Sequence, residues 1–564
     1  MRNNLFSEVK NIPQNIQKDK FLQRQLETAR SAALEYGEIK SLPYSDFKIF
    51  YITGSRNEYE DKYFAHRRLL DALAIKAAAG DGCIKELQDI LWAVTDEFTW
   101  AVPAHIPKEL PVGECVKQID LFAAETAFTL AEILYIFDEK LDAAVKERII
   151  SEVRRRVLEP YLSGIKNSWD ERENNWAAVC AGSVGAAFLY LADDNEIQRV
   201  LPRIKATLNC YLNGFGADGV CAEGINYWIY GFGYFTYFAR LLYNYTNGKE
   251  NLFDNPKVEN IAMFQQKIRF ADNKTVTFSD SGDAFIHRSG LSYFLAKNFK
   301  NVTIPDDSSA IGFDGDACYR FAHLIRDFAW RDTEYVKAAD NEYGFEYFEN
   351  SAWYINKTAN WEFAAKAGRN NESHNHNDIG VFILNTGGNS VITDPGKGEY
   401  TSEYFGEGRY GYFAPSADAH SVPVINGKKQ SDGEERFGKI SKADDKSLAI
   451  DFENAYDDKT LKKLRRCFEF SDNCIKMHDE LKFSELPSEI TEHFVSTAKP
   501  CICNDKIIIG DILLKCNMDL FVCEVSKKTF EIGHHKTKTV YLTDMHIKSP
   551  QKSVCAEFSF EINV

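Results

Sequence analysis

Histidines and aspartates of one segment are close enough in sequence to share a chemical task. His374 and His376 are separated by one residue in "SHNHND", Asp394 follows in "VITDPG" and His420 in "ADAHSVPVING". Because residues i and i+2 of an extended segment point to the same face, the two histidines can converge on one ion or divide two tasks. Imidazole nitrogens and a carboxylate oxygen form a normal zinc ligand set, with a fourth position left for water. The pattern predicts a metal site, against the plainer interpretation of separate polar turn residues.

A second group of polar and aromatic residues opens two helix-like runs earlier in the chain. Its members are Asn174, Asn175 and Trp176 in "ENNWAAVCAGS", and Glu223, Tyr227 and Tyr230 in "DGVCAEGINYWIYGFGYF". An amide can bind a carboxylate without titrating, and a phenol can transfer a proton. The plainer interpretation makes one asparagine a helix N-cap and the tyrosines core or rim residues. Their combination with the histidine motif favours a catalytic site.

The elements that must position this second group are helical. Apolar residues recur at spacings of three and four in "DLFAAETAFTLAEILYIF", "AAVKERIISEVRRRVLEPYL" and "WAAVCAGSVGAAFLYLA". Short polar loops separate such runs from about residue 60 to 335, and no repeat of fixed period is visible. We therefore predict an (α/α) toroid of unequal helical hairpins over residues 1–335, in preference to a regular solenoid.

The histidine motif lies in a part of the chain with a different pattern. After about residue 340, short β-prone runs such as "SAWYINKT", "GVFILNT" and "TKTVYLTD" are bounded by glycine, asparagine and aspartate. The pairs Gly387-Gly388 and Asn426-Gly427 suit hairpin turns because these residues tolerate positive φ. We predict an antiparallel β-sandwich over residues 336–564. An α+β chain of two domains also agrees with a length of 564 residues, which exceeds what one core usually fills.

Composition limits the partners and the compartment. The 67 basic and 83 acidic residues give a net charge of -16, which argues against a general nucleic-acid binder. No apolar run approaches the roughly 20 residues that span a bilayer. The thirteen cysteines form no regular framework, which fits buried thiols in a reducing cytoplasm. We expect a cytoplasmic protein without a membrane partner, or a periplasmic or secreted one if an export signal has been removed; a homo-oligomer is compatible with the sequence.

Taken together, these stretches resemble the heparinase II/III-like polysaccharide lyases, which have an N-terminal (α/α) toroid and a C-terminal antiparallel β-sandwich. The resemblance extends from "TWAVPAHIP" and "IDLFAAETA" through "ENNWAAVCAGS" to "SHNHNDIGVFILNTGGNSVITDPG" and "ADAHSVPVINGKKQ". It implies a carbon-oxygen lyase that cleaves an anionic, uronic-acid-containing polysaccharide or oligosaccharide, glycosaminoglycan-like or alginate-like. The product would carry a C4=C5 unsaturated uronate end.

The resemblance also implies a role for each motif residue. His374 would be the catalytic histidine and Tyr227 the catalytic tyrosine, with Tyr230 as the alternative one helical turn away. Asn175 would bind the substrate carboxylate. One divalent ion with a mainly structural role, for which zinc is the expected metal, would be held by His376, Asp394 and His420. Asn174, Trp176, Glu223, Arg288 and Arg409 are further candidates for substrate binding, the arginines because they bind carboxylate or sulfate bidentately.

One departure keeps alternatives open. Several members of the family have a histidine directly after the asparagine, where this chain has Trp176. A zinc-dependent hydrolase, with His374 as a fourth ligand or a base, is a second hypothesis. A glycan-binding protein without catalysis is a third, because Trp176 can stack on a sugar face. The lyase hypothesis is favoured because a hydrolase leaves Asn175 and Tyr227 without a task. A cupin, which also uses an HxH strand, is disfavoured because Asp378 and "IGVFILN" follow here.

Overall fold

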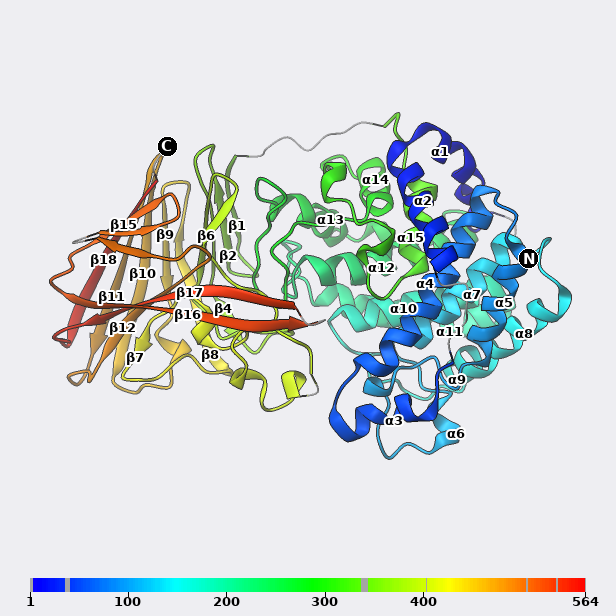
Figure 1. Cartoon of the computed structure of the whole chain (residues 1–564), viewed down its shortest axis with the longest axis horizontal. Coiled ribbons are helices and arrows are strands. Elements are labelled where there is room, and N and C mark those ends of the chain that lie inside the picture. Colours follow the sequence, from blue (N-terminus) through cyan, green and yellow to red (C-terminus); the bar gives the residue numbers. More distant parts are fainter. Residues whose placement is uncertain are drawn as a thin grey trace. The chain divides into compact units, whose positions relative to one another are not determined.

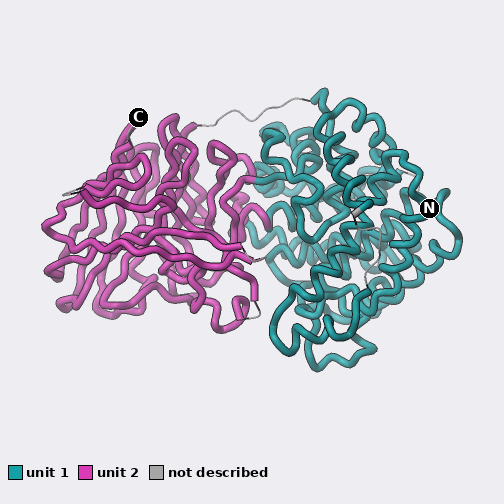
Figure 2. Tube along the Cα trace, viewed as in Figure 1, with its two compact units in different colours: residues 1–215, 227–263, 286–339 teal, residues 216–226, 264–285, 340–564 magenta. Residues whose placement is uncertain are grey.

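The chain folds into two compact units. The computed structural model describes residues 4–35, 41–335, 343–401, 403–503, 506–533 and 536–562. Unit 1 consists of Met1–Phe215, Tyr227–Met263 and Ile286–Ala339, and unit 2 of Gly216–Asn226, Phe264–Phe285 and Asp340–Val564 (Figure 2). Two segments from before residue 335, Gly216–Asn226 and Phe264–Phe285, thus belong to the same unit as the strands.

Helices make up most of unit 1 (Figure 1). In chain order the α-helices are α1 (Ile12–Lys18), α2 (Lys20–Glu35), α3 (Tyr44–Thr53), α4 (Asn57–Ala79), α5 (Ile84–Asp96), α6 (Val112–Cys115), α7 (Leu121–Phe137), α8 (Ala143–Val153), α9 (Glu159–Leu162), α10 (Asn175–Leu191), α11 (Asp194–Asn213), α12 (Ile225–Tyr245), α13 (Lys257–Lys267), α14 (Ser289–Asn298) and α15 (Phe321–Trp330). The three apolar runs singled out in the sequence form α7, α10 and the stretch from α8 to α9.

Helices of unit 1 alternate between an inner and an outer layer. Almost every residue of α7 and α10 is buried, whereas α5, α8 and α11 bury only one stripe of residues. The inner helices α4, α7, α10 and α15 pack against one another, and the hairpins α4–α5, α7–α8 and α10–α11 each pair an inner with an outer helix. This arrangement confirms the predicted toroid of helical hairpins.

Small residues of α10 explain how closely its neighbour can approach. A Cβ atom on Gly182 would lie 2.9 Å from the backbone oxygen of Tyr234, and one on Gly185 would lie 2.4 Å from the ring of Phe238. Both partners belong to α12. The "AGSVGAA" sequence thus brings α12, which carries the candidate tyrosines, against the helix that begins with Asn175.

Unit 2 contains two nine-stranded antiparallel sheets. In chain order the strands are β1 (Gly344–Phe348), β2 (Trp353–Lys357), β3 (Glu362–Lys366), β4 (Gly368–Asn370), β5 (Phe382–Thr386), β6 (Asn389–Ile392), β7 (Val424–Ile425), β8 (Gly433–Ala443), β9 (Ser447–Asp451), β10 (Leu461–Ser471), β11 (Cys474–Phe483), β12 (Ile490–Ser496), β13 (Cys501–Cys503), β14 (Lys506–Ile509), β15 (Ile512–Cys516), β16 (Phe521–Gly533), β17 (Lys536–Ile547) and β18 (Ser553–Ile562). One sheet has the order β1-β2-β3-β5-β6-β12-β17-β16, with β7 paired to β12, and the other β13-β14-β15-β18-β11-β10-β9-β8-β4.

The core of unit 2 lies between these sheets, as expected of a sandwich. Phe382 of β5 has its ring centroid 5.9 Å from Phe363 of its own sheet, and 5.2 and 5.6 Å from Phe468 and Phe560 of the other. Gly387 and Gly388, with φ of 51° and 73°, form the two-residue turn between β5 and β6. This predicted hairpin fixes the position from which the chain continues to Asp394.

The segments 216–226 and 264–285 are joined to each other and to the strand-rich part of unit 2. Ser279 Oγ donates to the Ala222 carbonyl at 2.8 Å, and Thr277 Oγ1 donates to the Asp394 carbonyl at 2.8 Å. The Lys397 amide donates to the Ser281 carbonyl at 3.2 Å. The "DPG" turn is therefore where the β-sandwich meets residues that come from between the helices.

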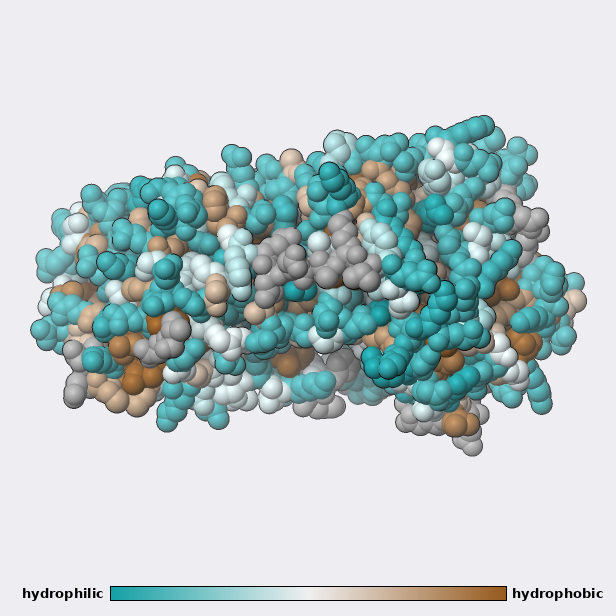
Figure 3. Space-filling model, turned by 90° about the horizontal axis from the view of Figure 1, so that it is seen from above, coloured by the Kyte–Doolittle hydropathy of each residue, from teal (hydrophilic) through white to brown (hydrophobic). Residues whose placement is uncertain are grey.

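The face of the molecule in the space-filling view is mostly polar. Hydrophilic side chains dominate the face shown in Figure 3, with small scattered hydrophobic patches. Among the described residues, no helix combines the length and apolarity required to cross a membrane. The cysteines differ from the expectation of buried thiols, because only four of the thirteen are buried and three, Cys501, Cys503 and Cys555, are exposed.

Gly396 of the "DPG" turn gives the first prediction. It has φ of 71°, and a Cβ atom would lie 2.1 Å from the Ser281 carbonyl oxygen. Gly427 has φ of 69° but no heavy atom within 4 Å of the same position. We expect Gly427→Ala to cost about 1 to 2 kcal/mol of unfolding free energy, from left-handed backbone strain alone. Gly396→Ala should cost about 2 to 5 kcal/mol because the clash adds to that strain. Denaturant unfolding measures both, and equal losses would contradict the proposed clash.

Candidate active site and metal centre

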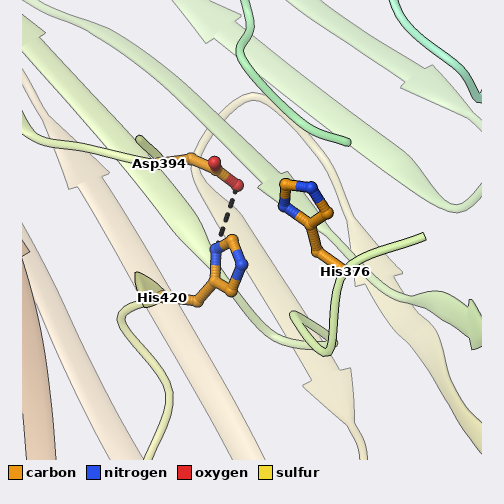
Figure 4. Close-up of side chains that lie close together, drawn as sticks. All are labelled: His376, Asp394 and His420. Atoms are coloured by element: carbon orange, nitrogen blue, oxygen red, sulfur yellow. Dashed lines mark ion pairs between the residues drawn. The ribbon is translucent and has the colours of Figure 1, made fainter. Parts of the chain in front are cut away.

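Three buried side chains of unit 2 converge on one point (Figure 4). His376 lies in the loop between β4 and β5, Asp394 follows β6, and His420 follows the short 3₁₀ helix Ala417–Ala419. All three have 0% exposure, and one potential ligand atom of each lies within 4.8 Å of the others. The structure thus brings together the three residues that the sequence analysis assigned to a metal.

Hydrogen bonds fix the tautomers of both histidines. His376 Nε2 lies 3.0 Å from Asp280 Oδ1, and His420 Nε2 lies 3.1 Å from the Ala414 carbonyl oxygen. Because both partners are acceptors, each Nε2 carries the proton and each Nδ1 keeps its lone pair. These Nδ1 atoms and Asp394 Oδ2 are buried without a hydrogen bond among the described residues. Asp394 Oδ2 and His420 Nδ1 are 3.2 Å apart.

The electrostatics of this trio favour a cation. Burial lowers the pKa of His376, so its ring is neutral near pH 7. Burial also opposes ionisation of Asp394, but attraction to His420 outweighs burial and lowers the pKa of that carboxyl. For His420 the attraction to Asp394 likewise outweighs burial and raises the pKa. Three buried ligand atoms without hydrogen bonds, two of them imidazole nitrogens, fit a divalent ion such as zinc.

Asp280 links this trio to the second histidine of the motif. Its Oδ2 atom accepts a hydrogen bond from His374 Nδ1 at 2.7 Å, while its Oδ1 atom accepts from His376 Nε2. Asp280 is almost completely buried, which by itself raises the pKa of its carboxyl. The hydrogen bonds from the two histidines outweigh burial and hold that pKa well below its usual value. Asp280 is therefore an ionised carboxylate that orients both rings.

His374 is held in an uncommon backbone conformation. Its φ is 56°, in the left-handed region that non-glycine residues seldom occupy. With Nδ1 bonded to Asp280, Nε2 faces Glu223, whose Oε1 lies 3.4 Å away and also accepts from Ser373 Oγ at 3.1 Å. The His374 side chain is 15% exposed, in contrast to the fully buried His376. The His374 side chain is thus partly accessible to solvent, whereas His376 is part of the interior.

Arg409, a candidate for substrate binding, has its donors committed to this network. Nη2 donates to Asp280 Oδ2 at 3.1 Å, and Nε donates to the Asn375 carbonyl at 3.0 Å. The hydroxyl of Tyr404 donates to Asp280 Oδ1 at 2.7 Å. These contacts make Arg409 and Tyr404 supports of the Asp280 carboxylate.

Two other polar residues near the motifs also have protein partners. Asp378, the last residue of the HxHxD run, is paired with Lys366 of β3 at 2.9 Å, and both are buried. Arg288, a second arginine candidate, is 3% exposed in unit 1 and contacts Asp316 and Asp327 at 3.0 and 3.3 Å. Both side chains neutralise buried charges of their own unit.

The start of α10 carries the asparagine candidates. Asn174 is the N-cap, with its Oδ1 accepting from the Trp176 amide at 3.2 Å, as the plainer interpretation expected. Asn175 is the first residue of the helix and is 2% exposed. The Trp176 ring lies 4.9 Å from the ring of His105, and the Arg172 guanidinium is 5.4 Å from its centroid.

The two candidate tyrosines of α12 differ in burial. Tyr227 is partly exposed, whereas Tyr230 is buried at 8% exposure beneath the guanidinium of Arg320, 3.9 Å from its ring centroid. Burial raises the pKa of Tyr230 well above its usual value, and the charge of Glu125 adds to the effect. Of the two, Tyr227 is the hydroxyl that a substrate can reach more easily.

The candidate residues belong to both units. Unit 2 contains His374, His376, Asp394, His420, Glu223 and Arg409, and unit 1 contains Asn174, Asn175, Trp176, Tyr227, Tyr230 and Arg288. Sequence reasoning missed Asp280 and Tyr404. Asp280 lies in "FSDSGDAF", which carries no motif, and only a fold that places it beside the histidines reveals its role.

Comparisons with known proteins agree with the sequence resemblance. Residues 341–487 match the family described as heparinase II/III-like, C-terminal. This range includes His374, His376, Asp394 and His420. No curated protein sequence matches the chain. Heparan sulfate lyase HepC from Pedobacter heparinus has a similar structure, with a TM-score of 0.61 and 14% identity over 96% of this chain and 83% of that one.

Two further solved structures extend the likeness. Chondroitin AC lyase from Streptomyces coelicolor A3, in complex with chondroitin sulphate, gives a TM-score of 0.59 at 10% identity, with 99% of this chain and 83% of that chain covered. Paenibacillus xanthan lyase gives 0.59 at 10% identity and covers 100% of this chain and 59% of that chain. Likenesses at this level of identity establish a shared fold.

The trio of buried ligand atoms gives the second prediction. We expect purified protein to contain about one equivalent of a divalent metal, and His420→Ala to lose it because one of three ligands is removed. The variant should also melt at a lower temperature, since a bound ion stabilises the folded state. Elemental analysis and thermal unfolding measure the two effects. His478→Ala on β11 is the matched control and should keep the metal. The metal assignment would be contradicted if wild-type protein without metal melted at the same temperature as wild-type protein with metal.

Proposed function

We propose that this chain, in which residues 341–487 form a heparinase II/III-like C-terminal domain, is a polysaccharide lyase that cleaves uronic-acid-containing glycans by β-elimination. The observation that carries the proposal is the placement of His374. Its Nδ1 donates to the ionised Asp280 at 2.7 Å, and its Nε2 lies 3.4 Å from Glu223 Oε1 in a side chain that is 15% exposed. A histidine oriented by a carboxylate is suited to general acid-base catalysis.

β-Elimination from a uronic acid requires such a group. The proton on C5 must be removed and the oxygen on C4 must leave, with a C4=C5 double bond as the result. In the proposal His374 Nε2 exchanges one of these protons, and the neighbouring Glu223 Oε1 stabilises the imidazolium while it is charged. Tyr227 handles the other proton, as the family resemblance implies. Which of the two acts as the base depends on the face from which the C5 proton projects.

Charge on the substrate carboxylate rises as the C5 proton leaves. An amide donor such as Asn175 can stabilise this charge without itself titrating, and its contribution grows towards the transition state. Asn175 is nearly fully buried at the first turn of α10, where backbone amides also face an incoming anion. We therefore assign carboxylate binding to Asn175.

The metal, in this proposal, is structural. It would supply positive charge that joins the segments carrying His376, Asp394 and His420. His376 then fixes Asp280 through Nε2, and Asp280 fixes His374 through Nδ1. Removal of the ion would make the position of His374 less well defined, but would remove no group that acts on the substrate.

The contacts of His374 also weigh against a zinc hydrolase. Among the described residues, the group that could share a metal consists of His376, Asp394 and His420, and His374 is not part of it. A non-catalytic glycan binder is disfavoured because Trp176, its main support, packs against His105 and Arg172.

The proposed function is tested with a panel of uronate-containing glycans, monitored for the ultraviolet absorbance of the unsaturated product. Cleavage without that absorbance would favour the hydrolase.

The third prediction concerns the residues that act on the substrate. We expect Tyr227→Phe and His374→Ala each to lower turnover by about 10²- to 10⁴-fold, the usual contribution of a general acid or base. Asn175→Ala should lower it by about 10²-fold or more because the enolate loses its donor. Metal content and melting temperature should stay unchanged. Tyr230→Phe is the internal control. Full activity of Tyr227→Phe with loss of activity in Tyr230→Phe would reverse the assignment of the two tyrosines.

The fourth prediction separates the positioning role of Asp280 from simple folding. Asp280→Asn keeps the size of the side chain but removes its charge and one of its acceptor oxygens. We expect kcat to fall by about 10²-fold or more, as when the carboxylate that orients a catalytic histidine is lost, with little change in KM. Asp283→Asn is the control, because the Asp283 carboxylate contacts Lys538 at 3.3 Å and lies outside the histidine network. An unchanged kcat in folded, metal-loaded Asp280→Asn would remove the positioning role.

A further inference from the structure

A cavity in unit 1, apart from the histidine network, has the chemistry of a sugar-binding site. Its volume is about 400 Å³, within the range of small-ligand sites. The cavity lies between α3, the loop from Pro107 to Leu110 and α6, which are seen at the lower edge of the helical unit in Figure 1. We call it the tyrosine–lysine pocket. Its charged and aromatic lining consists of Tyr44, Phe47, Lys48, Tyr51, Tyr59, Phe98 and Lys108.

Aromatic rings of this pocket contact one another. The ring centroid of Phe47 lies 5.5 Å from that of Phe98, 5.8 Å from Tyr51 and 5.9 Å from Tyr59, in tilted or edge-on geometry. Tyr44 is 72% exposed and Phe98 is 43% exposed, so aromatic surface remains in contact with solvent. Exposed aromatic faces suit the apolar faces of pyranose rings.

The charge of the pocket is opposite to that of the protein. Lys48 and Lys108 line it and, among the residues that the structure describes, neither forms an ion pair with a carboxylate. The Lys48 ammonium lies 5.9 Å from the Tyr44 ring centroid. None of the described lining residues is acidic, although the chain as a whole has a net charge of -16. Two cations beside aromatic rings select an occupant that combines negative charge with an apolar face.

A short loop connects the pocket to the start of α10. The Tyr51 hydroxyl lies 3.1 Å from the carbonyl oxygens of Pro103 and Ile106, the residues on either side of Ala104 and His105. His105 in turn contacts the ring of Trp176, the neighbour of Asn175. One loop therefore separates the tyrosine–lysine pocket from the proposed carboxylate-binding asparagine.

We propose that the tyrosine–lysine pocket binds an anionic sugar residue of the substrate chain, at a position other than the uronate that reacts. The inference rests on the proposed function and extends it to a second binding position. Lys48 and Lys108 contact the carboxylate or sulfate of that residue, and Tyr44 stacks on its ring. Glycans long enough to fill the pocket bind more tightly than shorter ones, and higher salt reduces the difference.

The test measures binding in an otherwise inactive background. His374→Ala protein is titrated by calorimetry with uronate-containing oligosaccharides of increasing length, alone and combined with Lys48→Ala, Lys108→Ala or Tyr44→Ala. We expect each added substitution to raise the dissociation constant of the longer oligosaccharides by about tenfold, because one contact is lost. The dissociation constant of the shortest oligosaccharides should not change. Lys85→Ala, an exposed lysine of unit 1 outside the pocket, is the charge control and should have no effect. Lys48→Arg should retain affinity, and thermal unfolding verifies that each variant is folded.

The outcomes distinguish this inference from the proposed function. If wild-type protein generates the unsaturated product while all pocket variants bind every length as the control does, the pocket assignment is wrong and the lyase stands. If only Tyr44→Ala weakens binding, the occupant is an uncharged sugar and the anionic assignment is wrong. If wild-type protein cleaves no uronate glycan but the lysine variants lose affinity for one, the pocket stands and the lyase fails. If it neither cleaves nor binds any of them, both are overturned.

Discussion

The carboxylate of Asp280 is the contact on which the rest of the site depends. It is nearly inaccessible to water and accepts hydrogen bonds from His374, His376, Tyr404 and Arg409. A buried charge is tolerable only when partners of this kind replace its hydration. Because the same carboxylate binds two imidazoles through opposite oxygens, the orientation of one ring is tied to that of the other. The position of the ring proposed to move protons is therefore set by the ring proposed to hold the metal.

This arrangement separates rigidity from reactivity. His376, Asp394 and His420 are completely buried, and the two histidine tautomers are fixed by acceptors on their outer nitrogens. His374 is only two residues from His376, but its backbone has left-handed φ and its side chain is partly exposed. Strain of this kind persists only where surrounding contacts determine it, and here Asp280, Glu223 and Ser373 supply them.

Local patterns in the sequence predicted the local structure well. Apolar spacing identified α7 and α10, and alternation and turn residues identified β5 and β6. Histidine and aspartate types indicated a metal site, and the family resemblance selected the three ligands that the structure brings together. Asp280 could not be found in this way because it lies 94 positions before His374, inside an ordinary loop. Arg409 was expected to bind substrate, and no local pattern could reveal that it donates to Asp280. Pairings over such distances depend on tertiary structure, which periodicity does not encode.

Because the chain passes from one unit to the other and back, the order of synthesis and the possible exchange of gene segments are both constrained. The strand-rich unit takes two of its segments, Gly216–Asn226 and Phe264–Phe285, from between helices of the other unit. A ribosome therefore releases Glu223 and Asp280 well before the strands that will receive them, and the site is complete only after His420 has emerged. A gene fragment that begins at the first strand would encode the β-sandwich without the carboxylate that orients its histidines. The two units are thus not modules that recombination can exchange at a single boundary.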